Sequence, residues 1–195
     1  MRREVAADLS NSARDFKDVV WPRISDAVGG GDLIPVESVT VDQFAAELDR
    51  IAGIDAWIVQ RGTYMLGVGS RVQWVATGAV PFNTFTVRMR RPNGVPTEYE
   101  KRKAQIATSG ALYPKWTCQA YLEKAESGFL TAAVAATDDV IGAVDLGIGY
   151  KRTAYDGVQF WVVPWGDLWR SGCGSLSVVD RNGVHRCRQP EEPTS

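Results

Sequence analysis

The sequence has one histidine, three cysteines and no run of 18 consecutive apolar residues among its 195 residues. The missing apolar run predicts that no segment spans a membrane. Met1-Arg2-Arg3-Glu4 is not followed by an apolar stretch, which predicts no signal peptide. The cysteines, Cys118, Cys173 and Cys187, are odd in number and widely spaced, so they fit a reduced protein better than a disulfide framework. We therefore expect a cytoplasmic protein.

The small number of histidines and cysteines also argues against several kinds of catalytic site. A Ser-His-Asp or Cys-His arrangement needs His185 as its base, but nothing in the sequence places a nucleophile beside this residue, which lies in a predicted hairpin. Cys173, Cys187 and His185 also lack the paired spacing of zinc ligands. There is no Gly-Lys-Ser/Thr phosphate loop, and Gly67-Val68-Gly69-Ser70-Arg71-Val72 lacks the last glycine of a dinucleotide fingerprint. Chemistry based on a hard metal ion remains.

The overall composition is that of a globular protein, with 45% hydrophobic and 23% charged residues. The length predicts a single domain, which we place at residues 1–188, followed by a disordered tail at 189–195. Residues 56–124 hold 10 basic and 3 acidic side chains, a net charge of +7, whereas both flanking segments are acidic. This segregation predicts a positive surface that attracts phosphate. The alternative is that these charges are scattered in space and neutralised by the flanks.

Hydrophobic periodicity and turn residues divide the chain into helices and strands. The helix predicted from Ser12, interrupted at Pro22, carries an apolar stripe of Phe16, Val19, Val20, Ile24 and Ala27. Further helices are predicted from residue 41, after the capping box formed by Thr97 and Glu100, and within 129–146. Predicted strands cover 54–59, 65–76, 84–90, 116–122 and 158–163. A C-terminal hairpin turns at Asn182-Gly183. This order predicts an α/β protein, in which a mixed β-sheet is flanked by helices.

The candidate site lies where two neighbouring strands begin. Asp55 stands at the head of a nearly apolar strand, and Arg71 and Gln73 share one face of the next strand. Magnesium prefers oxygen ligands and needs only one or two protein carboxylates when a substrate phosphate is present. Asp55 and Gln73 are therefore candidate magnesium ligands, and Arg71 is a candidate for stabilising charge on phosphorus. The alternative is a capped strand start beside an ordinary polar strand face.

An acid on the first helix could complete this metal site. Asp15 and Asp18 lie about one turn apart and share a helix face. Acids are also favoured near the positive end of a helix dipole, so the simpler interpretation is a solvated helix start. We retain Asp18 as the candidate third ligand.

The segment Gly53-Ile54-Asp55, followed by a strand that carries Gln73, resembles the PD-(D/E)XK nuclease superfamily. The resemblance is to its Mrr-like branch, in which a Gly-Ile-Asp strand precedes a Gln-x-Lys strand. It covers roughly residues 12–125. It implies a restriction-endonuclease-like core, a magnesium ion bound by Asp55 with help from Gln73, and hydrolysis of DNA. More loosely, the chain resembles small nicking components of bacterial phage-defence and DNA phosphorothioation systems.

The sequence departs from that family at position 75, where Val75 stands in place of the lysine that activates water. Arg71 is the nearest cation on the same strand face. Either Arg71 substitutes for the lysine, or the site is altered or inactive. Arginine stays protonated and cannot act as a general base, so substitution would be limited to stabilising charge.

Basic residues after the candidate site form a candidate DNA-binding surface. Arg88 and Arg90 share the exposed face of a predicted strand, and Lys101, Arg102 and Lys103 follow on a predicted helix. Such side chains hold the DNA backbone, although an ordinary solvated surface carries them as well. Most of the seven tryptophans are expected in the core; Trp74, Trp165 and Trp169 are alternatives for lining a groove or a dimer contact.

Three functions remain open at this point. The first is a magnesium-dependent DNA endonuclease, with a nickase of a defence or DNA-modification system as its context. The second is a DNA-binding module of the same fold without catalysis, which the missing lysine favours. The third is a protein-interaction subunit of a defence system. The candidate partners are accordingly DNA, a second copy of the chain in a homodimer, and other defence-system proteins.

Overall fold

The computed structural model describes residues 11–36, 53–60, 64–92, 94–124 and 128–186. Within these residues the strands form two sheets. The larger sheet has the order β1 (Asp32–Pro35), β2 (Ala56–Gln60), β3 (Tyr64–Val75), β5 (Pro114–Glu123), β6 (Phe129–Ala136), β9 (Ser177–Asp180) and β10 (Gly183–Arg186). The smaller sheet has the order β4 (Thr84–Arg90), β8 (Gln159–Pro164) and β7 (Tyr150–Thr153). The larger sheet is mixed, because β3 and β5 pair in parallel whereas all its other described strand pairs are antiparallel.

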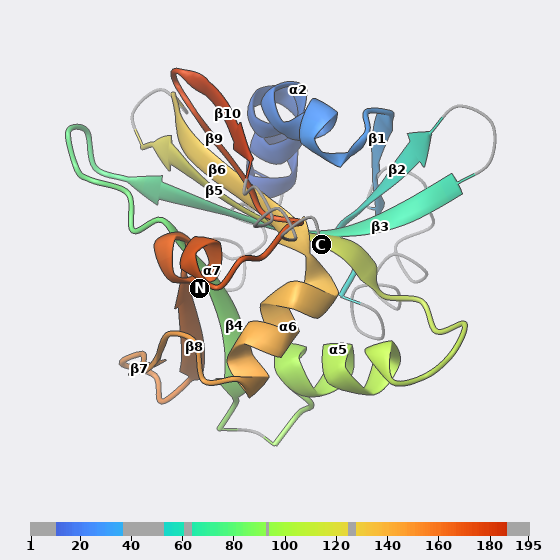
Figure 1. Ribbon diagram of the computed structural model, residues 1–195. Helices are drawn as coiled ribbons and strands as arrows, with labels where there is room; N and C mark the ends of the chain where they lie inside the picture. Colours follow the sequence, from blue (N-terminus) through green and yellow to red (C-terminus); the bar gives the residue numbers. More distant parts are fainter. Residues whose placement is uncertain (1–10, 37–52, 61–63, 93, 125–127, 187–195) are drawn as a thin grey trace, which may run out of the picture.

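Helical segments lie on both faces of the larger sheet (Figure 1). On one face lie η1 (Phe16–Val20), α2 (Trp21–Ile24) and η2 (Ser25–Val28). On the other face lie α5 (Glu98–Ile106), α6 (Thr137–Asp145) and the smaller sheet, with the short helix α7 (Trp165–Arg170) after β8. The fold is therefore α/β with a mixed sheet flanked by helices, as the sequence predicts.

The N-terminal helical segment follows the predicted apolar stripe. Phe16, Val20 and Ile24 are buried against the larger sheet, because they recur on one side of the helix. A π-helical turn lies directly before Pro22, which has no backbone N–H to donate. The segment ends at Gly29, whose φ of 89° is a left-handed conformation that favours glycine.

Strand β3 changes partner along its length: its first part pairs with β2 and its later part with β5. Its first part pairs with β2, up to the pair of Ala56 and Val68. From there to Val75 the ladder that the structure describes is the parallel one with β5. The chain between β3 and β5 crosses over through β4 and α5, which places both elements under the same face of the sheet.

Most of the predicted strands are confirmed, including 84–90, although this strand belongs to the smaller sheet. The prediction of helix from residue 129 was wrong, because residues 129–136 form β6 and the helix starts only at Thr137. Strand β6 is buried on both faces, so its alanine-rich sequence lacks the alternation that marks a half-exposed strand. The C-terminal hairpin is confirmed as β9 and β10. The helix predicted over 41–51 and the tail at 189–195 lie outside the described residues.

The start of α5 is fixed by the predicted capping box. The Thr97 hydroxyl accepts a hydrogen bond from the Glu100 N–H at 3.3 Å, and the Glu100 carboxylate accepts one from the Thr97 N–H at 2.8 Å. Both contacts satisfy backbone donors that a helix start leaves without partners. The cap therefore fixes the positions from which the Glu98 and Arg102 side chains project from the helix.

Replacing Thr97 with alanine should lower the free energy of unfolding by about 1 kcal/mol, because the capping hydroxyl is lost. Urea denaturation followed by circular dichroism measures this change. Thr97→Ser keeps the hydroxyl and is expected to retain most of the stability. Equal stability of Thr97→Ala and the wild type would contradict a contribution from the cap.

Candidate functional site

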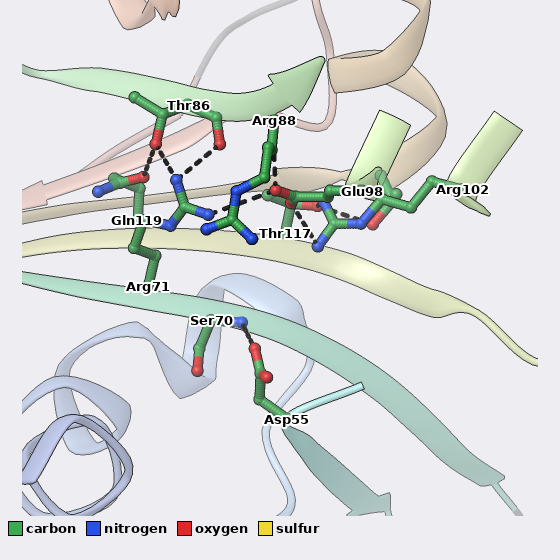
Figure 2. A network of polar contacts seen from close by, with 10 residues as sticks. Asp55, Ser70, Arg71, Thr86, Arg88, Glu98, Arg102, Thr117 and Gln119 are labelled. Atoms are coloured by element: carbon green, nitrogen blue, oxygen red, sulfur yellow. Dashed lines mark hydrogen bonds and ion pairs between the residues drawn. The ribbon is translucent and has the colours of Figure 1, made fainter. Parts of the chain in front are cut away.

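A cavity of about 570 Å³ lies beside β3, at the place where β2 and β3 separate. Its walls come from the segment before β2 and from β3, β4, α5, β5 and β8. Figure 2 shows that Arg71, Thr86, Arg88, Glu98, Arg102, Thr117 and Gln119 converge, whereas Asp55 lies apart from this group and meets the Ser70 N–H. Ser12 borders the cavity too, so the N-terminal helical segment reaches its rim.

Asp55 lies directly before β2 and continues its pairing with β3 by one residue. Its backbone N–H donates to the Val68 carbonyl at 2.9 Å, and its carboxylate accepts from the Ser70 N–H at 2.5 Å. The side chain thus takes the place of a strand partner for Ser70 (Figure 2). This contact holds a half-buried carboxylate at the cavity wall.

Arg71 reaches from β3 across the cavity to the smaller sheet. One guanidinium nitrogen donates to the hydroxyl and the carbonyl of Thr86, and the other donates to Glu98 at 3.3 Å. The Thr86 hydroxyl in turn donates to the side-chain oxygen of Gln119 at 3.3 Å. These contacts fix the guanidinium in one orientation (Figure 2). A side chain held in this way loses little freedom when it binds an anion.

Glu98 links the arginines of the cavity. Its carboxylate lies 2.9 Å from Arg102 and 3.3 Å from Arg71, and it accepts a hydrogen bond from the Arg88 N–H at 3.3 Å. The side chain is only 20% exposed. Burial alone would raise the pKa of Glu98, but the nearby Arg102 and Arg71, with the Arg88 N–H, hold this pKa below its usual value of 4.5. Glu98 is therefore a carboxylate at neutral pH.

Arg102 is buried, with 5% of its surface exposed. Besides Glu98, it donates to the Thr117 hydroxyl at 3.1 Å. It passes so close to β3 that a Cβ at Gly69 would lie 2.5 Å from its terminal nitrogen. The Gly69 backbone has no positive φ, so its conformation would accept other residues. The position of Arg102 is therefore what favours glycine at this site.

Gln119 gives the cavity a buried neutral group. It is 2% exposed and lies on β5 directly opposite Arg71 in the parallel ladder. Its oxygen accepts from Thr86, whereas its side-chain nitrogen has no hydrogen-bond partner among the described residues. A buried donor without a partner costs free energy that a bound acceptor, such as a phosphate oxygen, would recover.

The electrostatic balance of the cavity is positive. Among the described residues that line it, five are cationic (Arg71, Arg88, Arg91, Lys101 and Arg102) and two are acidic (Asp55 and Glu98). Burial, followed by the neighbouring Arg71 and Arg91, lowers the pKa of Arg88. Unbalanced like charges repel each other, so an anion in the cavity would be stabilised.

Six of the predicted site residues line this one cavity: Asp55, Arg71, Gln73, Arg88, Lys101 and Arg102. Arg90 and Lys103 do not line it; both are exposed, and Lys103 pairs with Asp145 at 2.9 Å. Asp18 does not line it either and is exposed on η1. The buried acid of that helical segment is Asp15, whose carboxylate accepts from the Trp74 indole N–H at 2.9 Å. The helix therefore meets the cavity through Trp74, a cavity residue, instead of through Asp18.

Sequence reasoning missed Glu98, Gln119, Arg91 and Phe160, which also line the cavity. The spacing of Glu98 and Arg102, four residues apart on a predicted helix, was a usable signal for their ion pair. Gln119 lies in a nearly apolar strand, and a polar residue in such a strand indicates a buried side chain that needs a hydrogen-bond partner.

The structure describes Cys118 and His185, two residues considered above for other kinds of site, whereas Cys187 lies outside the described residues. Burial raises the pKa of the Cys118 thiol, so this cysteine is a neutral core side chain. His185 lies on the exposed side of the C-terminal hairpin, with Asp180 at 3.3 Å. Of the three tryptophans considered for a groove, Trp74 lines the cavity and Trp165 is buried in the core.

The cavity lining includes oxygen groups of the kind that bind magnesium. Asp55 and Gln73 both line the cavity and offer a carboxylate and an amide oxygen, and magnesium accepts one or two such ligands beside a substrate phosphate. No group of three or more His, Cys, Asp or Glu side chains able to hold a metal occurs in the described part of the chain. Glu98 is already committed to two arginines.

Comparison of the chain with protein-family models, curated proteins and solved structures finds no match. None of the helices in the described ranges is long and apolar enough to cross a membrane. The function of the protein is therefore inferred from the residues that line the cavity.

Replacing Glu98 with glutamine should lower the free energy of unfolding by about 3 kcal/mol near pH 7, because the buried Arg102 and the partly buried Arg71 lose their counter-charge. The depressed pKa of Glu98 means that its stabilisation is complete above about pH 4.5 and is lost as the pH falls through the folded-state pKa. The variant should therefore lose less stability than the wild type between pH 5 and about pH 3. Chemical denaturation at several pH values measures both effects, and Asp18→Asn, an exposed acid, is the control. Parallel pH curves for Glu98→Gln and wild type would contradict this role.

Replacing Gly69 with alanine should displace Arg102 and cost about 1–3 kcal/mol of stability, because the new Cβ overlaps the guanidinium. The cost should shrink when Arg102 is already alanine, and a double-mutant cycle in urea measures this coupling. Gly142→Ala is the matched control, since a Cβ at this helical position meets nothing within 4 Å. Equal costs in both backgrounds would show that Arg102 is not the constraint.

Proposed function

We propose that this protein is a magnesium-dependent DNA endonuclease whose site is the cavity beside β3. One observation carries the proposal: Asp55 and Gln73 line the same cavity as five cationic side chains, where the cations exceed the carboxylates by three. The charge suits a phosphodiester, and the two oxygen ligands suit a divalent ion beside it. The resemblance of the Gly53–Asp55 and Gln73 motifs to the PD-(D/E)XK nucleases, which also have a mixed sheet flanked by helices, supports the same function.

The cationic residues supply binding and charge stabilisation. Arg88 and Lys101 reach the cavity from β4 and α5, so they approach a DNA backbone from two sides. Arg71 is held by Thr86 and Glu98, and such a preorganised donor stabilises charge that develops on a phosphate during cleavage. The Gln119 amide N–H, which has no partner among the described residues, is a further donor for a phosphate oxygen.

The metal would be held by Asp55 and Gln73. A magnesium ion held there would act as a Lewis acid and lower the pKa of a bound water, which would lessen the need for a protein base. This matters because position 75 is valine and Arg71 stays protonated, so no side chain on this face of β3 takes a proton from water. Asp55 is already oriented by the Ser70 N–H, which limits its movement when a metal binds.

A DNA-binding module without catalysis is the second candidate. It is favoured by the commitment of Glu98 to Arg71 and Arg102, which leaves Asp55 as the other carboxylate of the cavity. In that case the same cations hold the DNA backbone and no bond is broken. The context that the looser resemblance implies, a nickase of a phage-defence or DNA-modification system, applies to the first candidate.

The proposal is tested by relaxation of supercoiled plasmid with magnesium. The wild type should nick the plasmid, and Asp55→Asn should reduce nicking to the level seen without protein, because the carboxylate charge is lost. Asparagine keeps an oxygen that can accept from the Ser70 N–H, so the local fold is retained. Asp18→Asn is the matched control and should cut like the wild type, since Asp18 lies outside the cavity lining.

Failure to cut is informative when DNA binding is measured on the same proteins at low salt. If wild type and Asp55→Asn both shift DNA without cutting it, the binding-module candidate replaces the nuclease. Binding should then weaken in Arg88→Ala but not in Lys103→Ala, which removes an equal charge outside the cavity lining. It should also fall steeply with salt. Absence of both cutting and binding would refute the two candidates together.

A further inference from the structure

The polar wall of the cavity continues onto one face of the smaller sheet. Arg88 on β4 lies opposite Phe160 on β8, and Phe160 lies opposite Arg152 on β7. Directly opposed residues project from the same face of a sheet, so these three side chains form a row across it. The guanidinium carbons of Arg71 and Arg88 lie 5.9 Å and 5.7 Å from the centre of the Phe160 ring.

The row leads outward to exposed aromatic rings. The Arg152 guanidinium lies 6.0 Å from the centre of the Phe82 ring, and Phe82 is 65% exposed. Tyr150 precedes Arg152 by two residues on β7, which places it on the same face, and it is 53% exposed. We call Phe160, Arg152, Phe82 and Tyr150 the aromatic track.

Buried residues beneath the aromatic track hold the Phe82 ring in place. The ring of Phe82 contacts Tyr121 edge-on, with 6.5 Å between the ring centres. The Tyr121 ring is buried, and its hydroxyl is held by Thr84 at 3.1 Å. The cations beside Phe160 and Phe82, and the buried ring beneath Phe82, orient these two aromatic faces before any ligand arrives.

The other face of the smaller sheet differs in character. It packs on α6 through Phe85, Val87 and Val163, which are buried. Lys151, the neighbour of Arg152 in sequence, projects to that side and lies 5.9 Å from the centre of the Trp161 ring. The alternation of exposed rings and arginines is therefore a property of the cavity-facing side.

We infer that the aromatic track binds the unpaired bases of single-stranded DNA whose phosphate occupies the cavity. Bases stacked on aromatic side chains and phosphates beside cations are how single strands are held without sequence preference. A duplex keeps its base faces stacked inside, so it would leave Phe82 and Tyr150 unused. The inference depends on the proposed function in one respect, namely that the cavity holds DNA phosphate, and it names the substrate as DNA with a single-stranded segment.

Fluorescence anisotropy tests the inference, with a labelled oligothymidylate of about 15 nucleotides and a duplex of equal length as probes. A chelator in the buffer prevents cleavage. The wild type should bind the single strand more tightly than the duplex. Phe82→Ala, Tyr150→Ala and Arg152→Ala should each weaken single-strand binding about fivefold or more, since one stacking or cation contact is lost. Binding of the duplex should stay unchanged in these variants.

Two control variants match these changes. Lys151→Ala removes the same charge as Arg152→Ala from the opposite face of the same strand. Leu146→Ala removes an apolar side chain that is 80% exposed and lies after α6. Both should bind the single strand like the wild type.

The outcomes separate this inference from the proposed function. Track variants that bind single strands like the wild type, or a wild type that prefers the duplex, would overturn the inference. The cavity proposal would survive in both cases if Arg88→Ala still weakens duplex binding. A wild type that binds neither probe would refute DNA binding by the cavity and the inference with it.

Discussion

The placement of one carboxylate decides how the cavity is built. Glu98 neutralises part of the charge of Arg71 and Arg102, which come from β3 and α5, and it also accepts the backbone N–H of Arg88 on β4. Three elements that are separate in the chain are thereby tied at one point. Without this carboxylate, the arginines would repel each other inside a partly buried space. The cavity can therefore concentrate positive charge only because an acid stands between the arginines.

Local patterns allowed much of the fold to be predicted. The capping box at Thr97, the alternation over 84–90 and the Asn182-Gly183 turn each act within a few residues, so single-sequence reasoning detects them. Six of the predicted site residues line one cavity, and among them Asp55 and the polar face of β3 were expected to be neighbours because their segments follow each other in the chain. The strand β6 was missed since burial on both faces removes the periodic signal.

The remaining site residues depend on contacts between distant segments. Gln119 faces Arg71 only because β3 and β5 pair in parallel, and Phe160 meets Arg71 only because a second sheet lies beneath the first. The separation of β4 into that second sheet follows from tertiary packing, since its alternating sequence suits either sheet. Asp18 was chosen over Asp15 although their spacing predicts one shared helix face and does not distinguish them; in the structure Asp15 is buried at Trp74 and Asp18 is exposed.

The change of partner along β3 has a consequence for how the protein folds. Pairing of β2 with β3 closes a short loop, whereas pairing of β3 with β5 must first bring together segments separated by β4 and α5. Such non-local pairings raise the contact order and form late, because the entropy of the intervening chain is lost before the contacts reward it. Arg71 and Gln119 can meet only after that step. We therefore expect this cavity to form among the last events of folding, and any ligand that binds there favours the completed sheet over an intermediate.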